Sequence, residues 1–590
     1  MNKVARGGES TAENERRPVH VLYTQYVERG ENGDIAERLW RRIPANMIEA
    51  YKALVDVRKE YGEPTEAIEG LKKELRNDLR RRGILTSKVA ENIDRLECGA
   101  VESGQQPMCL GGPSLILNKI AYTRSLCSLG GEGFVPLFYV ADYDGVQPEL
   151  LNIRVPSTSP RGLLISYPGR SEYIGSPIHL LPNPREEWMK KTFDKIESNY
   201  RGLLRELEPH VRDRMLLNLA HALTVLKNAY YSTENVSDWS TKTLGSLINI
   251  EADLGIPLLS PSTPAMRPLF QTGYELLLAE PNRSRFIAAS NEAVDLIERV
   301  GCRPQIGRRR DDFVPFFLEC SAAGCHSSRV ELKYIKKNGF PTAAAVGKCP
   351  KCGEVYEFSF NAHNPDLSDL INWISPRVDT RQVIVDSVIP VLAHVGGPGE
   401  TSYYAEVIPA VQPLDVSFPI YLRYTRTFYN TPWNVRYAEK LKESGCITLM
   451  RDELFQALGQ WVEARNKEDA ERLFEAHIKI RRAIEITYKQ LLSHHQALKS
   501  EVEAIKRRLR ETSDRGDLIC KMRGMQGLSH EIEIYLSSAF GRFSPERFGE
   551  EVSWTWLDLA TVTGLQDLLG VYLRQYNGLT PNSSMYFVNL

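Results

Sequence analysis

The sequence has no excess of charge of either sign. Its 590 residues include 74 Lys+Arg and 75 Asp+Glu, which gives a formal net charge of -1 at pH 7. A nucleic-acid-binding protein normally carries a basic excess, whereas the short basic clusters here, 80–82, 308–310 and 506–510, are mostly interleaved with acids. We therefore predict that these clusters are solvated surface and that nucleic acid is not a partner.

Long apolar runs are also missing, since no segment approaches the roughly 18 consecutive apolar residues that a membrane span requires. The first 17 residues are polar and charged and lack the apolar stretch of a signal peptide. Cysteines are few and unevenly spread, ten in all, which does not fit a secreted disulfide framework. We predict a cytoplasmic protein with no membrane partner and a disordered tail over residues 1–20.

The composition is that of a globular protein, with 42% hydrophobic and 25% charged residues. The chain is too long for one hydrophobic core, so two to four structural units are expected. Helical spacing of apolar residues gives way near residue 97 to short apolar runs bounded by glycine. The predicted regions are N-terminal helices over 21–96, an α/β core over 97–310 and 363–450, an insertion over 311–362, and a helical region over 451–590.

The core begins with a predicted βαβ unit: a strand at 99–103, a helix at 115–126 and a strand at 134–140. Residues 244–258 are interpreted as strand and loop. The Val- and Ile-rich stretches 382–395 and 407–423 indicate that the α/β pattern resumes after the insertion. The simplest fold class is α/β, with one Rossmann-like parallel sheet interrupted by insertions.

The helical region contains a heptad seam, in which core residues alternate by four and three positions. His495 stands at a core position, where we expect it to fix the register. Two interpretations stay open: an antiparallel hairpin within one chain, or a coiled coil between two chains that forms a homodimer. The seam residues are Ile484, Tyr488, Leu491, His495, Leu498, Val502, Ile505 and Leu509.

Four cysteines in two close pairs form the strongest chemical signal. Cys320 and Cys325 precede Cys349 and Cys352, and a glycine follows the second pair, as in a zinc knuckle. Four thiolates close a tetrahedral shell around Zn²⁺ and leave no position for water or substrate. We predict a structural zinc ribbon, with flanking strands at 328–334 and 354–360.

The first glycine-rich loop lies between the strand at 99–103 and the following helix. Glycines at such a junction allow backbone N–H groups to approach a phosphate at the helix N-terminus, although many turns of this kind only satisfy geometry. Lys119 lies nearly two turns into the helix, and its reach to an anion is left open. The candidate nucleotide-binding residues here are Gly104, Gln105, Gln106, Gly111, Gly112 and Lys119.

Asp142 and Asp144 follow the strand at 134–140. Carboxylates just beyond the end of a parallel strand lie where such sheets bind ligands, so this pair is a candidate for holding an amine or Mg²⁺. Turn formation and helix capping are the alternative roles.

A third loop follows the Val- and Ile-rich run that ends at 395. Gly396, Gly397 and Gly399 precede Glu400 at the start of a helix, which suits contact with a phosphate or a carboxylate, or else a structural hinge. Two such loops after two strands of one sheet favour a ligand site.

Taken together, these loops resemble the bacillithiol-biosynthesis cysteine-adding enzyme family. The resemblance extends over much of the chain and includes the terminal coiled coil. The Gly-Gln-Gln and Gly-Gly-Pro-Gly-Glu motifs are the most specific matches. The matching segments are 92–96, 104–106 with Gly112 and Pro113, 135–138, 300–305, 375–377 with Asp386, and 396–400 before Tyr403.

The resemblance implies a Rossmann core like that of class I aminoacyl-tRNA synthetases and a coiled-coil arm that supports dimerisation. It also implies a ligase that joins cysteine to the glucosamine of a glucosaminyl-malate, with ATP (or ADP) as the bound nucleotide. By this likeness the loop at 104–113 faces nucleotide, Asp142 and Asp144 face the amine, and the loop at 396–400 with Glu400 closes the pocket.

The sequence departs from the family pattern in three ways. Family members usually carry histidine where Asn118 and Tyr143 stand, the segment around Asp142 is shortened, and the paired-cysteine ribbon is unusual. Changes at pocket positions can alter the substrate while the fold is kept. The alternative is a non-catalytic synthetase-like paralogue that binds nucleotide, RNA or protein.

Overall fold

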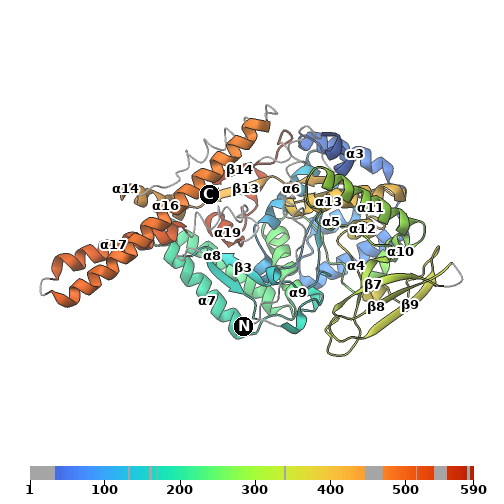
Figure 1. Ribbon diagram of the computed structural model, residues 1–590, viewed down its shortest axis with the longest axis horizontal. Helices are drawn as coiled ribbons and strands as arrows, with labels where there is room; N and C mark the ends of the chain where they lie inside the picture. Colours follow the sequence, from blue (N-terminus) through green and yellow to red (C-terminus); the bar gives the residue numbers. More distant parts are fainter. Residues whose placement is uncertain are drawn as a thin grey trace, which may run out of the picture.

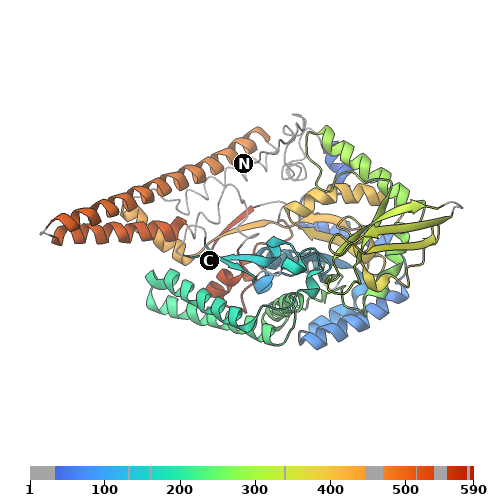
Figure 2. The same ribbon diagram turned by 60° about the horizontal axis from the view of Figure 1, so that its bottom comes forward.

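The computed structural model describes residues 33–130, 133–157, 162–168, 171–337, 341–445, 470–512, 515–536, 554–580 and 585–590. The tail predicted over residues 1–20 lies outside these ranges. Within them, none of the helices combines the length and the apolar character needed to cross a bilayer. Figures 1 and 2 show a long helical pair extending from one side of the molecule and a group of antiparallel strands on the opposite side.

A five-stranded parallel sheet forms the centre of the fold, as the glycine-bounded apolar runs predict. Every residue of its strands β2 and β11 is buried, which is typical of a parallel sheet covered by helices on both faces. The Rossmann-like fold class is therefore confirmed. The strands, in spatial order, are β12 (Ile420–Arg423), β11 (Val391–Gly396), β1 (Ala100–Gln105), β2 (Val135–Val140) and β5 (Leu258–Leu259).

Two connections run in opposite directions from the middle of this sheet. Helix α6 (Leu115–Ser128) packs on β1 and β2, whereas α13 (Pro398–Val411) packs on β11 and β12. The chain thus leaves β1 and β11, which are neighbours, toward opposite edges. A crevice is expected at such a topological switch point, beyond the carboxyl ends of the two strands.

A second five-stranded sheet is antiparallel and contains the predicted ribbon. The strands expected at 328–334 and 354–360 are present with bounds shifted by a residue or two. The sheet is larger than the predicted insertion, because its edge strand β10 lies beyond residue 362 and leads directly to 377–381. Its strands, in spatial order, are β10 (Ile374–Pro376), β6 (Phe313–Glu319), β7 (Arg329–Lys336), β8 (Thr342–Lys348) and β9 (Val355–Asn361).

Helices cover the rest of the core, and at two places they replace expected strands. Residues 236–251 form helix α9 (Val236–Gly245) and the π-helical turn η7 (Ser246–Glu251), and only Leu258–Leu259 is strand. Residues 407–411 end helix α13. The other helices before residue 400 are α2 (Gly33–Trp40), α3 (Met47–Glu60), α4 (Glu66–Arg82), α5 (Ser87–Asp94), α7 (Glu186–Leu203), α8 (Pro209–Tyr231), α10 (Gln271–Leu278), α11 (Asn282–Arg299) and α12 (Arg381–Asp386).

The projecting pair consists of α16 (Ala470–Glu511) and α17 (Gly516–Tyr535), which pack antiparallel within the chain (Figure 1). His495 Nδ1 lies 3.1 Å from the Ser529 carbonyl oxygen, so the described part of the seam faces α17. The side chains of Ile484 and Tyr488 lie outside the described residues. A homodimer through this arm stays a prediction.

The region after 451 is not purely helical. Strand β14 (Met585–Asn589) pairs in parallel with β13 (Arg426–Asn430), and Trp554 and Trp556 are buried in the core. Helices α19 (Leu557–Thr563) and α20 (Gly570–Leu573) also lie in this region, and α14 (Pro432–Glu443) precedes it.

Candidate active site and metal centre

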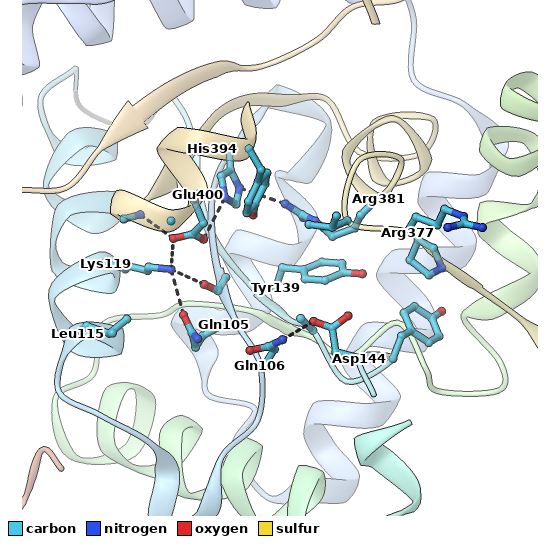
Figure 3. Close-up of a pocket in the computed structure, with 18 of the residues that line it drawn as sticks. Gln105, Gln106, Leu115, Lys119, Tyr139, Asp144, Arg377, Arg381, His394 and Glu400 are labelled. Atoms are coloured by element: carbon cyan, nitrogen blue, oxygen red, sulfur yellow. Dashed lines mark hydrogen bonds and ion pairs between the residues drawn. The ribbon is translucent and has the colours of Figure 1, made fainter. Parts of the chain in front are cut away.

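A cavity of about 370 Å³ lies at the switch point of the parallel sheet. Both glycine-rich loops reach it, since Gly104, Gln105 and Gln106 line one side and Gly397, Gly399 and Glu400 another. The third wall comes from the end of the antiparallel sheet, at 376–378, and from Arg381. The sequence therefore predicted correctly that the two loops meet. Figure 3 shows these walls around a common space.

A line of buried charged side chains forms the floor of this cavity. Arg381 donates to Glu102 Oε1, which also lies 2.9 Å from His394 Nδ1. The other imidazole nitrogen, Nε2, lies 3.5 Å from Glu400 Oε1, and Glu400 Oε2 accepts a 2.6 Å hydrogen bond from Lys119. An ion pair stands at each end of the line, Arg381 with Glu102 and Lys119 with Glu400, and each offsets the cost of burying its charges.

The electrostatics of this line keep both carboxyls ionised. Burial raises the pKa of Glu102, but Arg381 and His394 outweigh burial and hold that pKa below its usual range. For Glu400, burial likewise opposes ionisation, yet Lys119 and His394 lower its pKa to about 2. A carboxyl with so low a pKa is a poor proton acceptor near neutral pH. The contacts of Glu400 therefore do not support the catalytic role predicted for it.

Lys119 and Glu400 are used in contacts within the protein. The Lys119 ammonium donates to the Gly104 carbonyl at 3.0 Å, to Gln105 Oε1 at 3.1 Å and to Glu400. An ammonium has three donors, so this set uses all of them. Glu400 also accepts from the Gly397 N–H at 2.6 Å and so caps α13. This pair connects the first and third loops (Figure 3).

The two predicted aspartates separate. Asp144 lines the cavity with 38% of its side chain exposed, and it accepts a 2.6 Å hydrogen bond from Gln106. Asp142 turns away and accepts from the Ser262 hydroxyl at 2.6 Å and from the Ser262 N–H at 3.2 Å. Burial raises the pKa of Asp142 to about 7, despite these hydrogen bonds and the charge of Arg82. Asp142 is therefore not among the groups that face the cavity.

Of the six predicted glycines, Gly104, Gly397 and Gly399 line the cavity and the others do not. Gly399 has open space where a Cβ would stand, whereas a Cβ on Gly104 would lie 2.9 Å from the Tyr139 carbonyl oxygen. Gly396 packs against Tyr421 and Glu400 and does not line the cavity. Gly111 and Gly112 are also absent from the cavity lining, because their turn packs against Thr243, Trp556, Ile116 and Met108.

The sequence analysis assigned no role to Arg377 and Arg381, which form the cationic wall of the cavity. Arg377 lies at the end of β10, with its Nε 2.8 Å from the Val314 carbonyl and its guanidinium 4.3 Å from the centre of the Phe317 ring. Burial lowers the pKa of Arg377, although Asp379 and Glu331 oppose the shift. The matched segment 375–377 was the available signal. His394 also escaped assignment, although it stands at the end of a buried strand.

Asn118 and Tyr143, the two positions where histidine was expected from the family resemblance, are buried. Asn118 donates a 2.7 Å hydrogen bond to the Thr425 carbonyl, and Tyr143 donates to the Pro261 carbonyl. Tyr143 lines the cavity, whereas Asn118 contacts the segment that leads into β13. Only the change at Tyr143 therefore alters the cavity wall.

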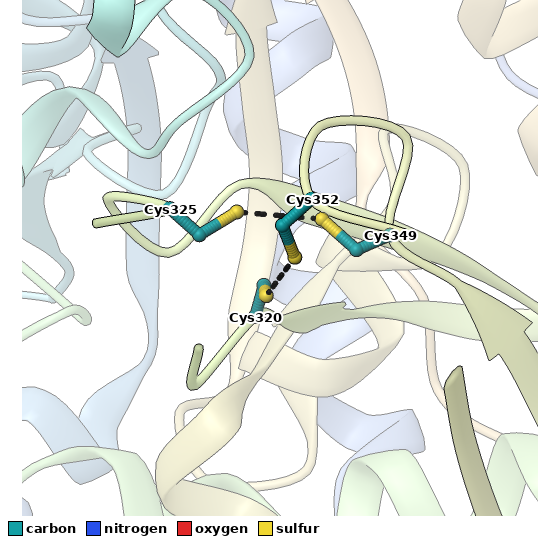
Figure 4. Close-up of side chains that lie close together, drawn as sticks. All are labelled: Cys320, Cys325, Cys349 and Cys352. Atoms are coloured by element: carbon teal, nitrogen blue, oxygen red, sulfur yellow. Dashed lines mark hydrogen bonds between the residues drawn. The ribbon is translucent and has the colours of Figure 1, made fainter. Parts of the chain in front are cut away.

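The four predicted cysteines come together on the loops of the antiparallel sheet (Figure 4). Their sulfur atoms all lie within 4.8 Å of one another, and the separations Cys325–Cys349 and Cys320–Cys352 are 3.4 and 3.5 Å. A disulfide needs about 2.05 Å, whereas thiolates about 2.3 Å from a tetrahedral ion lie about 3.8 Å apart. This cluster can therefore hold a metal ion.

Comparison with known proteins agrees with this architecture. Residues 16–424, more than half of the chain, match the family described as bacillithiol biosynthesis BshC, N-terminal Rossmann-like domain. A protein of Desulforamulus reducens named "Putative cysteine ligase BshC" is 25% identical over 330 residues, 54% of this chain and 53% of that protein. Proteins of the same name from Thermus thermophilus and Prosthecochloris aestuarii are 26% and 22% identical over 54% and 62% of this chain, and 55% and 60% of their own lengths. The chain thus spans little more than half the length of these curated relatives.

Proposed function

The chain belongs to the bacillithiol biosynthesis BshC family, and from this premise we propose that it is an amide-forming ligase. Its amino-acid substrate is cysteine by analogy with the names of its relatives. The acceptor is an amine, such as the amino group of glucosaminyl-malate, and ATP activates the carboxylate. The supporting observation is one cavity that is lined by both glycine-rich loops, by the partly exposed carboxylate of Asp144 and by two arginines.

The charges of the cavity suit two substrates of opposite character. Asp144 offers a carboxylate to an ammonium or amine group, while Arg377 and Arg381 lie on the opposite wall, where they favour a carboxylate or phosphate. The backbone at Gly399, where a Cβ would meet open space, leaves room for a nucleotide close to the sheet edge. Positioning of the two reactants then supplies a large part of the rate enhancement.

We assign the proton transfer to His394. When the amine attacks the activated carboxylate, the nitrogen must lose a proton, and imidazole is the group best suited to accept one near neutral pH. Glu102 binds Nδ1 at 2.9 Å and so directs the other nitrogen, Nε2, away from the strand. That nitrogen is buried, makes no hydrogen bond among the described residues, and lies 3.5 Å from Glu400 Oε1. Glu102 is then a positioning residue, and Asp142 and Glu400 take no direct part.

We further propose that the four cysteines bind Zn²⁺. A tetrahedral site with four thiolate ligands is typical of Zn²⁺. Four protein ligands fill the coordination shell and leave no open position for a substrate. The ion would be held by Cys320, Cys325, Cys349 and Cys352 and would stabilise the fold of the sheet.

The test of the reaction is a purified-protein assay with ATP, cysteine and glucosaminyl-malate. Nucleotide consumption should require both other substrates, and mass spectrometry should detect the amide. Nucleotide binding with no product from any pair of amino acid and amino-sugar would instead favour the non-catalytic paralogue.

His394→Gln tests the assignment of the base. It should lower kcat by roughly 10²- to 10⁴-fold, because the proposed proton acceptor is removed. His494→Gln, an exposed histidine on α16, is the matched control and should behave like the unmodified protein. A His394→Gln protein that keeps its kcat would exclude this histidine as the proton acceptor.

A further inference from the structure

The cysteine loops rest on a segment that the active site also uses. The His326 ring, next to Cys325, stacks on Tyr173 with 4.4 Å between ring centres. Lys351, between Cys349 and Cys352, donates to the Glu172 carbonyl oxygen. The Arg329 N–H, at the start of β7, donates to the Gly175 carbonyl at 3.0 Å. Residues beside both cysteine pairs therefore contact residues 172–175.

This segment and the three residues that follow it, 176–178, fix the loop that carries Asp144, and the Gly175 N–H donates to the Val146 carbonyl at 3.4 Å. The Val146 N–H donates to the Ser176 carbonyl at 2.8 Å, and the Ile178 N–H donates to the Asp144 carbonyl at 2.9 Å. Gly145 and Pro177 form an isolated antiparallel bridge. The backbone around Asp144, the predicted aspartate that lines the cavity, is thus held by a segment that contacts the cysteine loops.

Arg329 joins this loop to the opposite wall through its side chain. Its Nη1 lies 3.7 Å from Asp144 Oδ1, and its Nη2 donates a 2.8 Å hydrogen bond to the Pro376 carbonyl. The guanidinium lies 4.1 Å from the centre of the Phe317 ring, and only 16% of the side chain is exposed. Pro376 immediately precedes Arg377, so one side chain spans both walls of the cavity.

We propose that the metal ribbon positions the walls of the cavity and that Arg329 is the positioning residue that couples them. Only three residues lie between Cys325 and Arg329, so ordering of the first cysteine loop by a metal ion also orders the start of β7. The coupling acts on the amine-binding side at Asp144 and on the anion-binding side at Arg377. It does not involve the groups assigned to proton transfer. This inference rests on the proposed function for its kinetic consequence alone.

The experiment compares Arg329→Gln and Arg329→Lys in the full-length, metal-loaded protein. Lys333→Gln, an exposed residue of the same strand, is the matched control. We would measure three properties of each variant. These are the bound metal, the hydrogen exchange of residues 141–146 and 374–378 without substrates, and kcat and KM for the amine substrate. Arg329→Gln should keep its metal, raise exchange in both segments about tenfold and raise KM about tenfold with kcat changed less than about threefold. Arg329→Lys should restore part of the effect.

Removal of the metal by a chelator is the second arm. Hydrogen exchange should rise at 141–146 as well as in the cysteine loops. In Arg329→Gln, metal removal should cause a smaller rise in exchange at 141–146. An effect confined to the cysteine loops, or unchanged exchange and KM in Arg329→Gln, would overturn the inference. Coupled exchange without ligase turnover would support the positioning role and count against the proposed reaction only.

Discussion

The two five-stranded sheets of this protein are stabilised in different ways. In the parallel sheet, strands β2 and β11 are buried at every residue, and helices α3, α6 and α13 pack on it. In the antiparallel sheet, the outer strand β9 alternates between exposed and half-buried residues, and four cysteines gather at the loops. Burial suffices for the first sheet, whereas the second buries less apolar surface and carries a potential metal cross-link instead.

The cavity lies where the two sheets meet, and each contributes a different property. The parallel sheet supplies Glu102 and His394, which strand register places opposite each other. Helices α12, α6 and α13 add Arg381, Lys119 and Glu400 to the line. The antiparallel sheet supplies Arg377 and Arg329 from the ends of its strands. A rigid floor is thus combined with walls whose order depends on the ribbon.

The largest expected effect comes from removing a cysteine ligand. Cys349→Ser should abolish stoichiometric metal binding and expose strands β7 to β9, because structural zinc contributes apparent free energies of about 10–16 kcal/mol in small domains. Metal analysis and hydrogen exchange measure both changes, and amides of β1 and β11 should stay protected. Cys520→Ser, an exposed cysteine on α17, is the control. Full metal content in Cys349→Ser would remove the distinction between the sheets.

An intermediate effect is expected from shortening an apolar side chain in each sheet. Leu392 is fully buried in β11, whereas Val355 on β9 is 63% exposed. Leu392→Ala should lower the free energy of unfolding by about 2–5 kcal/mol, and Val355→Ala should change it by less than about 0.5 kcal/mol. Urea unfolding followed by circular dichroism gives both values. Equal losses would show that the antiparallel sheet also depends on burial.

The smallest effect concerns the cost that burial imposes on a carboxyl of the parallel sheet. The pKa of Asp142 is raised from 3.8 to about 7, because burial outweighs its hydrogen bonds. Between these values the folded state binds more protons than the unfolded state, so the free energy of unfolding falls as pH rises through this window. The slope due to Asp142 is at most about 1.4 kcal/mol per pH unit.

Asp142→Asn should flatten this pH dependence between pH 5 and 6 relative to the unmodified protein, as measured by urea unfolding at both pH values. Other buried acids contribute equally to both proteins, so the difference isolates Asp142. Parallel stability curves for the two proteins would show that Asp142 does not titrate in this range.

Propensity failed where tertiary packing decided the local structure. Residues 407–411 contain valine and isoleucine, which favour strands, yet they end helix α13, because this segment packs against β11, β12 and α11. The stretch 244–251 is apolar at three- and four-residue spacing, at Leu244, Leu247 and Ile248, and is helical. The pairing of β14 with β13 joins segments about 160 residues apart and leaves no local pattern.

The sequence by itself determined the family, the Rossmann-like class, the cysteine cluster and the meeting of the two glycine-rich loops. These follow from short motifs and from the order of strands and helices along the chain. Only the tertiary structure decided which members of each motif face the cavity. Asp144 faces it and Asp142 does not, and Lys119 reaches Glu400 across 281 positions. The physical reason is that a side chain's partners are set by strand register and helix packing between distant segments, and these contacts, not the residue type, determine its charge state and its freedom to bind a ligand.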